Sequence, residues 1–170
     1  PKTATAGAKR RSNGIARRAM SYADTSFLSS CYLDDVHTAD ARQYLERHKP
    51  RLPFVFLHWP EMARVIAAKS PAPNDDWEGL KTDVMSGDKL YVCALDADRV
   101  ARRAAGLLLN FSPRWPKLRA FDSMHVAAAI EGGFKTFLSF DTNSYQRVLA
   151  HTQKLSVWPA LTNAEKSRLR

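Results

Sequence analysis

Apolar residues recur at helical spacing between Arg119 and Gly133, and a short apolar run follows them. The face at positions i, i+3, i+4, i+7 and i+8 consists of Phe121, Met124, His125, Ala128 and Ala129. This spacing predicts one α-helix, and the pair Gly132-Gly133 can adopt positive φ and end it. Residues 136–140 are apolar and are followed by Asp141, so we predict a short buried strand there.

The rest of the chain alternates between similar apolar runs and amphipathic segments. The predicted strands are 21–28, 54–57 and 155–158, with 90–94 a strand or a connector, and the predicted helices are 38–49, 61–69, 77–85, 96–110 and 143–151. Residues 70–76 and 112–118 are predicted loops. Short apolar strands that alternate with helices favour an α/β domain with a mainly parallel sheet. Ligands of such sheets bind beyond the carboxyl ends of the strands.

The length of 170 residues suffices for one domain with a core. We expect a disordered basic extension at 1–19, a folded domain at 20–159 and a C-terminal tail at 160–170. No run approaches the roughly 18 apolar residues of a membrane span, and the start lacks the apolar segment of a secretory signal. Cys31 and Cys93 match no metal-binding spacing, so we expect free thiols in a cytoplasmic protein.

The net charge of +9 comes mostly from the two ends of the chain. Residues 1–18 carry six Lys and Arg residues and no acid. Such an arm can bind nucleic acid, but it can equally be an extension ahead of a natural start at Met20. No function is assigned to it.

Four acidic residues occupy the connections of the predicted fold. Asp24 lies in or at the end of the first strand, and Glu61 opens the helix after the second. Asp122 opens the helix that begins near residue 119, and Asp141 follows the strand at 136–140. Strand ends and helix starts can meet at one edge of a parallel sheet, so we expect these side chains to share a cleft.

Four carboxylates in one cleft require protonation or a cation. Two unit charges about 4 Å apart repel by roughly 4 kcal/mol at an effective dielectric of about 20. Ligands that are all oxygen favour Mg²⁺ or Mn²⁺. A divalent cation there can activate water and neutralise charge on a phosphate substrate.

Each of these residues also has a purely structural interpretation. Asp122 and Asp141 can serve as helix caps, and Glu61 can be a first-turn residue favoured by the helix dipole. His125 on an apolar face is typical of a packed, hydrogen-bonded histidine rather than a base. Asp24 is the hardest to explain structurally, because it interrupts an apolar stretch.

Four sequence stretches together resemble PIN-domain ribonucleases, most closely the VapC-type toxins of bacterial toxin–antitoxin pairs. They are Tyr22-Ala-Asp24-Thr-Ser26-Phe-Leu28, the helix opened by Glu61, Phe121-Asp122-Ser-Met-His125-Val-Ala-Ala-Ala129, and Phe137-Leu-Ser-Phe-Asp141. The first and third are the more specific, and the similarity spans about residues 20–159. One departure is His58-Trp59-Pro60 before Glu61, where small polar residues are more usual.

The resemblance implies a PIN-like α/β fold with a mainly parallel four- or five-stranded sheet between helices. It implies that Asp24, Glu61, Asp122 and Asp141 are the catalytic, metal-binding acids of a Mg²⁺- or Mn²⁺-dependent endoribonuclease. Ser26 would orient the first acid and His125 would support the site. The family also implies homodimers and inhibition by a small antitoxin protein whose tail enters the acidic cleft.

Basic residues ahead of Asp122 are candidates for RNA contacts. Arg114, Lys117 and Arg119 could hold phosphates, and Trp115 could stack on a base. The alternative is a solvated loop with Trp115 folded into the core or a dimer interface. Both interpretations are open from the sequence.

The sequence therefore favours a divalent-metal-dependent endoribonuclease that hydrolyses RNA phosphodiesters. One rival is a phosphotransfer or phosphatase-type domain with Asp24 as nucleophile, although the second acid such sites place two residues later is Ser26 here. The other rival is a catalytically silent PIN-like module that binds RNA or a protein.

Overall fold

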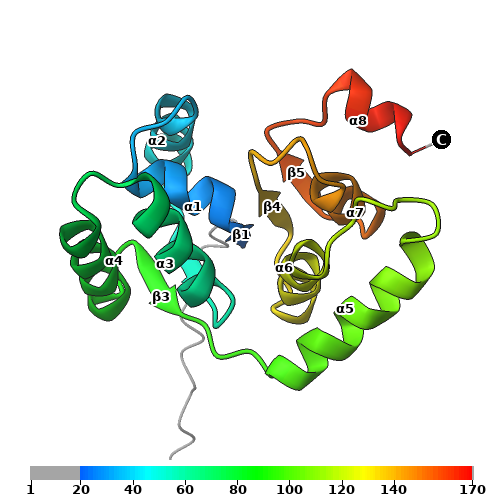
Figure 1. Cartoon of the computed structure of the whole chain (residues 1–170), viewed down its shortest axis with the longest axis horizontal. Helices are drawn as coiled ribbons and strands as arrows, with labels where there is room; N and C mark the ends of the chain where they lie inside the picture. Colours follow the sequence, from blue (N-terminus) through cyan, green and yellow to red (C-terminus); the bar gives the residue numbers. More distant parts are fainter. Residues whose placement is uncertain (1–19, 170) are drawn as a thin grey trace, which may run out of the picture.

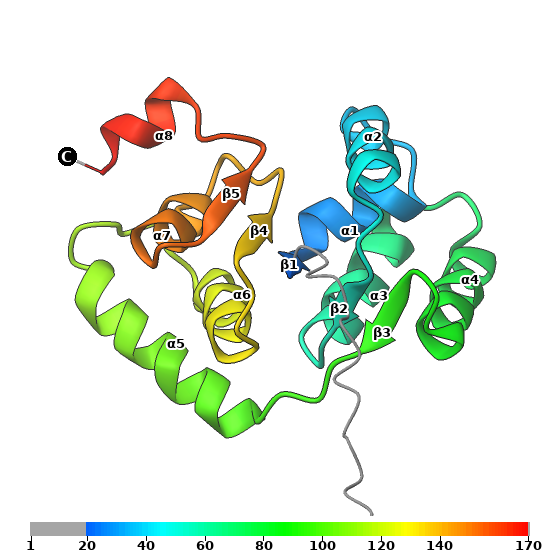
Figure 2. The same cartoon turned by 180° about the vertical axis from the view of Figure 1, so that it is seen from behind.

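The computed structural model of the chain describes residues 20–169, and the expected extension at 1–19 lies outside them. Its strands are short and all pair in parallel (Figures 1 and 2). β1 (Ser21–Ala23), β4 (Thr136–Leu138) and β5 (Ser156–Trp158) form one sheet in the order β1-β4-β5, and β2 (Leu52–Phe54) pairs with β3 (Leu90–Val92). The predicted α/β fold with parallel strands is confirmed, and the segment at 90–94 contains a strand. The expected single sheet of four or five strands is instead divided into a three-stranded and a two-stranded sheet over residues 20–169.

Helices cover these strands on both sides. They are α1 (Thr25–Tyr32), α2 (Thr38–His48), α3 (His58–Lys69), α4 (Pro73–Ser86), α5 (Ala97–Phe111), α6 (Ala120–Glu131), α7 (Gln146–Thr152) and α8 (Asn163–Ser167). Figures 1 and 2 show α1 to α4 with β2 and β3 in one half, α5 to α8 with β4 and β5 in the other, and β1 between them.

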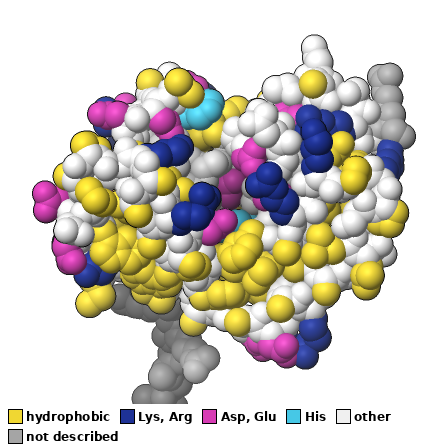
Figure 3. Space-filling model, in the orientation of Figure 1, with side chains coloured by type: hydrophobic (Ala, Val, Ile, Leu, Met, Phe, Trp, Pro, Cys, Tyr) yellow, Lys and Arg dark blue, Asp and Glu magenta, His cyan; other side chains and the backbone are white. Residues whose placement is uncertain are grey.

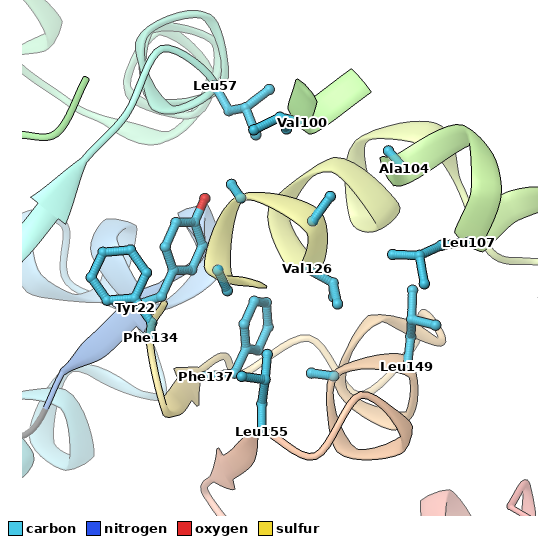
Figure 4. Packing of buried hydrophobic residues seen from close by; sticks show 14 of the residues in the cluster. Tyr22, Leu57, Val100, Ala104, Leu107, Val126, Phe134, Phe137, Leu149 and Leu155 are labelled. Carbon is cyan, nitrogen blue, oxygen red and sulfur yellow. The ribbon is translucent and has the colours of Figure 1, made fainter. Parts of the chain in front are cut away.

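Alternation along the strands creates two cores. Successive strand residues point to opposite faces, so Tyr22 joins the core beneath α5 and α6, while Ala23 joins the core of α1 to α4. Phe137 and Leu138 of β4 divide in the same way. Figure 4 shows Tyr22, Phe134 and Phe137 gathered beside α6. The sheet is therefore anchored on both faces, which fixes the positions of its carboxyl ends.

Small side chains let α6 approach its neighbours closely. Val126 and the three alanines at 127–129 are fully buried between the sheet, α5 and α7. Asp122 lies in the first turn of this helix. Because the buried stretch follows within one turn, the packing of α6 also fixes where Asp122 lies.

The first apolar stretch differs from the prediction. A strand was expected over 21–28, but β1 ends at Ala23 and α1 begins at Thr25. Asp24 causes the change, because it is the N-cap of α1 and accepts a hydrogen bond from the backbone N–H of Phe27. The apolar residues that follow belong to a helical face rather than to a strand.

Two other boundaries shift for local reasons. β2 lies at 52–54 instead of 54–57, so Val55 to Leu57 form the turn into α3. α4 begins at Pro73, within the predicted loop 70–76, since proline suits the first turn of a helix.

The expected tail at 160–170 is largely a packed part of the fold. Leu161 is buried, and Glu165 of α8 lies beside Arg147 of α7 in the interior. Nε of Arg147 donates to Oε1 of Glu165 over 2.7 Å, and its other nitrogens donate to backbone carbonyls, including that of Ser139. Between residues 20 and 169, no helix has the length and apolar character needed to span a bilayer.

Candidate active site

All four acids predicted from the sequence line one cavity of about 390 Å³. Asp24 directly follows β1, Glu61 and Asp122 lie in the first turns of α3 and α6, and Asp141 follows β4. Figure 3 shows acidic side chains in the hollow between the two halves of the molecule, with cationic side chains on both sides. A larger cavity of about 940 Å³ borders α1, α2 and α4, but none of these four acids lines it.

Asp24 is buried and held by its own helix. Only 3 % of the residue is exposed. Its Oδ1 accepts hydrogen bonds from the Ser26 hydroxyl at 2.7 Å and from the Phe27 N–H at 3.0 Å. Burial raises the pKa of Asp24 above its usual value, although the nearby His125 and these hydrogen bonds oppose the rise.

Ser26 links the first acid to the loop that carries the last. Its hydroxyl oxygen also accepts a hydrogen bond from the backbone N–H of Phe140 at 2.9 Å, next to Asp141. Ser26 therefore contacts both Asp24 and the backbone next to Asp141, and its role in orienting the first acid stays a prediction.

Glu61 is tied to two other elements. Its Oε2 lies 2.5 Å from Nε2 of His125 on α6 and accepts a hydrogen bond from the Thr25 hydroxyl on α1. Burial alone would raise the pKa of Glu61, but these hydrogen bonds and the charges of His125 and Arg64 outweigh it, so the pKa of Glu61 lies below its ordinary value. The carboxylate is therefore ionised and oriented at neutral pH.

A buried chain of polar side chains supports Glu61 from behind. The hydroxyl of Tyr22 lies 2.7 Å from Nδ1 of His125. Burial raises the pKa of Tyr22 well above its ordinary value, so the phenol keeps its proton. His125 therefore lies between Tyr22 and Glu61 and contacts both through its two ring nitrogens.

His58 joins the end of β1 to the start of α3. Its ring is fully buried, Nδ1 accepts from the Val55 N–H, and Nε2 lies 3.0 Å from the Ala23 carbonyl oxygen. Burial lowers the pKa of His58 well below its usual value, which keeps the ring neutral. The unusual residues before Glu61 therefore tie α3 to the strand that precedes Asp24.

The helix-cap interpretation holds for Asp122 but not for Asp141, because α7 begins at Gln146 with Tyr145 as its N-cap rather than at the predicted residue 143. Oδ2 of Asp122 accepts from the Arg119 N–H at 3.2 Å, and Oδ1 of Asp141 accepts from the N–H groups of Asn143 and Ser144. Burial raises the pKa of Asp122 to about 6; the Arg119 N–H opposes the rise, and the charge of Asp141 adds to it. The two carboxylates are therefore close enough to influence each other.

In each of the four acids, the hydrogen bonds within the fold use only one of the two carboxylate oxygens. Every hydrogen bond described above reaches a single oxygen of each carboxylate, namely Oδ1 of Asp24, Oε2 of Glu61, Oδ2 of Asp122 and Oδ1 of Asp141. Among the contacts of residues 20–169, the second oxygen of each carboxylate therefore has no hydrogen-bond donor. An oxygen-only set of this kind suits a hard divalent cation.

The carboxylates do not form a closed metal site in the present arrangement. Over residues 20–169, no group of three or more His, Cys, Asp or Glu side chains is placed to hold a metal ion. The expected convergence of Asp24 and Asp122 is thus a shared cavity rather than a shared coordination sphere. Like charges favour such separation, and rotation of side chains is needed to bring the second oxygens together.

Cationic side chains border the acids. Arg64 and Lys69 of α3 and Arg119 ahead of α6 line the same cavity. Arg119 and Asp141 also line a neighbouring cavity of about 610 Å³, together with Lys117. Positive charges therefore continue from the acidic cavity along the loop before α6, while Arg114 is exposed and lines neither cavity.

Trp115 does not have the position expected of an RNA-stacking residue. It is 2 % exposed, its ring stacks between those of Phe111 and Tyr145, and its indole N–H donates to the Arg168 carbonyl. The base contact considered for Trp115 is therefore incompatible with this arrangement, and its role is in the core. Burial of the large apolar surface of an indole is favourable, which explains why the ring packs between α5 and α7.

Sequence reasoning missed several residues of the site. Arg64 follows Glu61 by three positions and hence shares its helix face, a spacing that could have revealed it. Thr25 and Gln146 also line the cavity, and His58 and Tyr22 stand behind it. Their roles depend on contacts between distant elements, for which the sequence carries no local signal.

Comparisons with known proteins agree with this architecture. Residues 21–150 match the family described as PIN domain. No match was found among curated proteins. Among solved structures, the chain resembles VapC20 of Mycobacterium tuberculosis, described as a toxin that cleaves the sarcin-ricin loop, with a TM-score of 0.58 and 16 % identity over 72 % of this chain and 91 % of that one. Because the family match covers most of the sequence, the chain belongs to the PIN-domain family.

Proposed function

We propose that this protein is a divalent-metal-dependent endoribonuclease that hydrolyses RNA phosphodiesters and acts as the toxin of a bacterial toxin–antitoxin pair. The observation that carries the proposal is a set of four carboxylates around one cavity that cationic side chains border, in which the hydrogen bonds to residues 20–169 use one oxygen of each carboxylate. Nucleases of the PIN family generally use a divalent metal, and this donor set suits Mg²⁺ or Mn²⁺.

Asp24, Asp122 and Asp141, with Glu61, are the residues that would hold the cation. When bound, the cation supplies Lewis-acid activation of water and neutralises charge at the scissile phosphate. The raised pKa values of Asp24 and Asp122 favour this interpretation, since a nearby cation stabilises the ionised form that burial disfavours.

The surrounding residues would orient these acids and the substrate. Ser26 fixes Asp24, while Thr25 and His125 fix Glu61. Arg119 and Lys117 are placed to hold phosphates of the RNA strand as it leaves the acidic cavity. Positioning and charge compensation are the contributions that in-line displacement at phosphorus requires.

Cleavage of RNA by the purified protein tests the proposal. A structured RNA is incubated with Mg²⁺, with Mn²⁺ and with EDTA. We expect cleavage with either metal, none with EDTA, and none from the double variant Asp24→Asn, Asp122→Asn. Asparagine retains an oxygen that can accept the capping hydrogen bonds, so the helices should persist. Cleavage that survives both substitutions contradicts the proposal.

The rival functions predict different results from the same material. A silent PIN-like module would bind RNA without cutting it, and divalent ions would leave its melting temperature unchanged. A phosphotransfer domain would trap a beryllofluoride mimic of an acyl phosphate on Asp24. Both rivals are less well supported, because all four acids border the cavity and Ser26 occupies the place of the second phosphotransfer acid.

The partners of the toxin follow from the same proposal. VapC20 is described as a toxin, and a toxin of this kind pairs with a small antitoxin protein. A cationic antitoxin tail that enters the acidic cavity would compensate its charge. Co-expression with the product of a neighbouring reading frame should relieve the growth arrest that the toxin causes. The molecular mass of the purified protein in solution would test the expected homodimer, and cell fractionation would test the expected cytoplasmic location.

A further inference from the structure

Gln146 is a buried amide in the wall of the acidic cavity. It is the first residue of α7, follows Asp141 by five positions, and is 3 % exposed. Its backbone N–H donates to the Ser144 hydroxyl at 3.2 Å, which fixes the start of the helix. Gln146 is one of the residues that line the same cavity as Asp24, Asp122 and Asp141.

The side-chain nitrogen of Gln146 has no hydrogen-bond partner. Among the buried side-chain nitrogen and oxygen atoms of residues 20–169, Nε2 of Gln146 alone lacks one. Such orphan groups are rare in native proteins, and each calls for an explanation. Methionine or leucine would fill the same space without an unpaired amide, so the fold alone does not explain a glutamine here.

The chemistry of the cavity indicates what the amide would bind. The acids supply acceptors in excess, whereas the cations Arg64, Lys69 and Arg119 are exposed at its rim. A carboxamide carries two N–H donors, and rotation about its last side-chain bond exchanges nitrogen and oxygen. Gln146 is thus a neutral donor in the buried wall, suited to an anionic oxygen that enters beside the carboxylates.

We infer that Gln146 donates a hydrogen bond to a non-bridging phosphate oxygen of RNA bound in the acidic cavity. This inference rests on the proposed function, because it takes a phosphodiester as the ligand. A neutral donor holds the phosphate without forming an ion pair with Asp122 or Asp141, so it leaves those carboxylates available. Gln146 is therefore a substrate-binding residue of the site.

The test separates binding from stability with Gln146→Met, which keeps the length of the side chain and removes its donors. Gln153→Met, at the far end of α7, is the matched control; Nε2 of Gln153 lies 3.3 Å from the Thr152 hydroxyl. We measure the melting temperature, kcat/KM for RNA cleavage, and RNA affinity by fluorescence anisotropy with Ca²⁺ in place of Mg²⁺. We expect Gln146→Met to melt at or above the wild-type temperature, yet to lose about 10- to 100-fold in kcat/KM and in RNA affinity.

Other outcomes separate this inference from the proposed function. If the wild type cleaves RNA and Gln146→Met cleaves equally well, the inference fails and the function stands. If the wild type binds RNA without cleaving it, a loss of affinity in Gln146→Met supports the inference while the function fails. A variant that is unfolded or melts well below the wild type indicates a structural amide and overturns the inference. A wild type that neither binds nor cleaves RNA overturns both.

Discussion

Oε2 of Glu61 lies 2.5 Å from Nε2 of His125, so the acid that opens α3 is joined to the helix that carries Asp122. The two helices belong to different halves of the molecule, and Tyr22 of β1 completes the connection through Nδ1 of the same ring. One imidazole thereby sets the position of Glu61 relative to Asp122. A change at His125 should therefore alter both folding and the geometry of the acids.

We predict that His125→Ala lowers both stability and activity. The substitution leaves the buried Tyr22 hydroxyl without its partner, which costs about 1–3 kcal/mol of unfolding free energy. It also releases Glu61, so kcat/KM for RNA should fall by about 10- to 100-fold. Urea denaturation and RNA cleavage measure the two effects. His151→Ala, at an exposed position of α7, is the control, and equal behaviour of the two variants would refute the role of His125.

The raised pKa of Asp122 predicts a pH dependence of stability. The pKa of Asp122 is about 6 in the folded protein and about 3.8 as the ordinary value. The folded state therefore holds the proton more tightly, and this contribution to stability is complete below pH 4 and is lost as pH rises through 6. Asp122→Asn removes the effect, so the metal-free variant should exceed the metal-free wild type in unfolding free energy at pH 7.5 and match it near pH 3.5.

Metal binding should stabilise the wild type more than Asp122→Asn, which opposes the difference expected for the metal-free proteins. Mn²⁺ binds the ionised carboxylate, so it should raise the melting temperature of the wild type more at pH 7.5 than at pH 5, with little effect on Asp122→Asn. Asp98→Asn, at an exposed first-turn position of α5, is the control. An equal response to Mn²⁺ in wild type and Asp122→Asn would rule out Asp122 as a ligand.

The buried pair of Arg147 and Glu165 should be strongly coupled. Arg147 is 1 % exposed, so removal of either partner leaves an uncompensated interior charge and costs about 3–5 kcal/mol. The variants Arg147→Met, Glu165→Leu and their combination form a double-mutant cycle by urea denaturation. We expect the double variant to lose much less than the sum of the two single losses. The exposed pair of Arg42 and Asp34 serves as the comparison, and we expect its coupling free energy to be below about 1 kcal/mol. The prediction is contradicted if the losses of unfolding free energy in Arg147→Met and Glu165→Leu simply add in the double variant.

Salt dependence should reveal the phosphate contacts. If Arg119 and Lys117 each bind one phosphate, Arg119→Ala and Lys117→Ala should each reduce the slope of log affinity against log salt by about 0.7 for a single strand. RNA affinity by anisotropy at several salt concentrations gives this slope. Arg102→Ala, on the exposed side of α5, should leave the slope unchanged. A slope unaffected by the first two substitutions would place the RNA elsewhere.

The positions of the acidic residues could be predicted from the sequence, because they depend on the order of strands and helices along the chain. The four acids could be placed at strand ends and helix starts, because a parallel sheet brings such positions to one edge. The capping contact of Asp122 could be anticipated but not separated from a ligand role, and the hydrogen bonds of Asp141 lie in the loop before α7 rather than at a helix cap. Only the three-dimensional contacts reveal that the hydrogen bonds of each acid within residues 20–169 use a single carboxylate oxygen.

Long-range pairing explains most of what the sequence did not predict. Trp115 lies in a basic loop, yet its ring belongs to the core, because Phe111 and Tyr145 flank it from two other segments. Asp24 ends a strand that hydrophobicity alone would continue. The burial of Trp115 depends on Tyr145, which is distant in the sequence, whereas Asp24 ends the strand by capping α1, and hydrophobic periodicity reports neither contact.

One local signal for the C-terminal segment was present and went unused. Thr162 and Glu165 have the spacing of a capping box, and each side chain accepts a hydrogen bond from the other's backbone N–H. The box predicts a helix start within the expected tail. What it cannot predict is that Glu165 also meets Arg147.

The family match ends at residue 150, but the packed structure extends further. A fragment cut at that boundary would retain Arg147 in the interior while discarding Glu165, the backbone carbonyls of Pro159 and Ala160, and the whole of β5. The residues matched by the family and the residues packed into the fold therefore differ in this chain. A truncated form of the protein, or a fusion placed after it, should keep β5 and α8 intact.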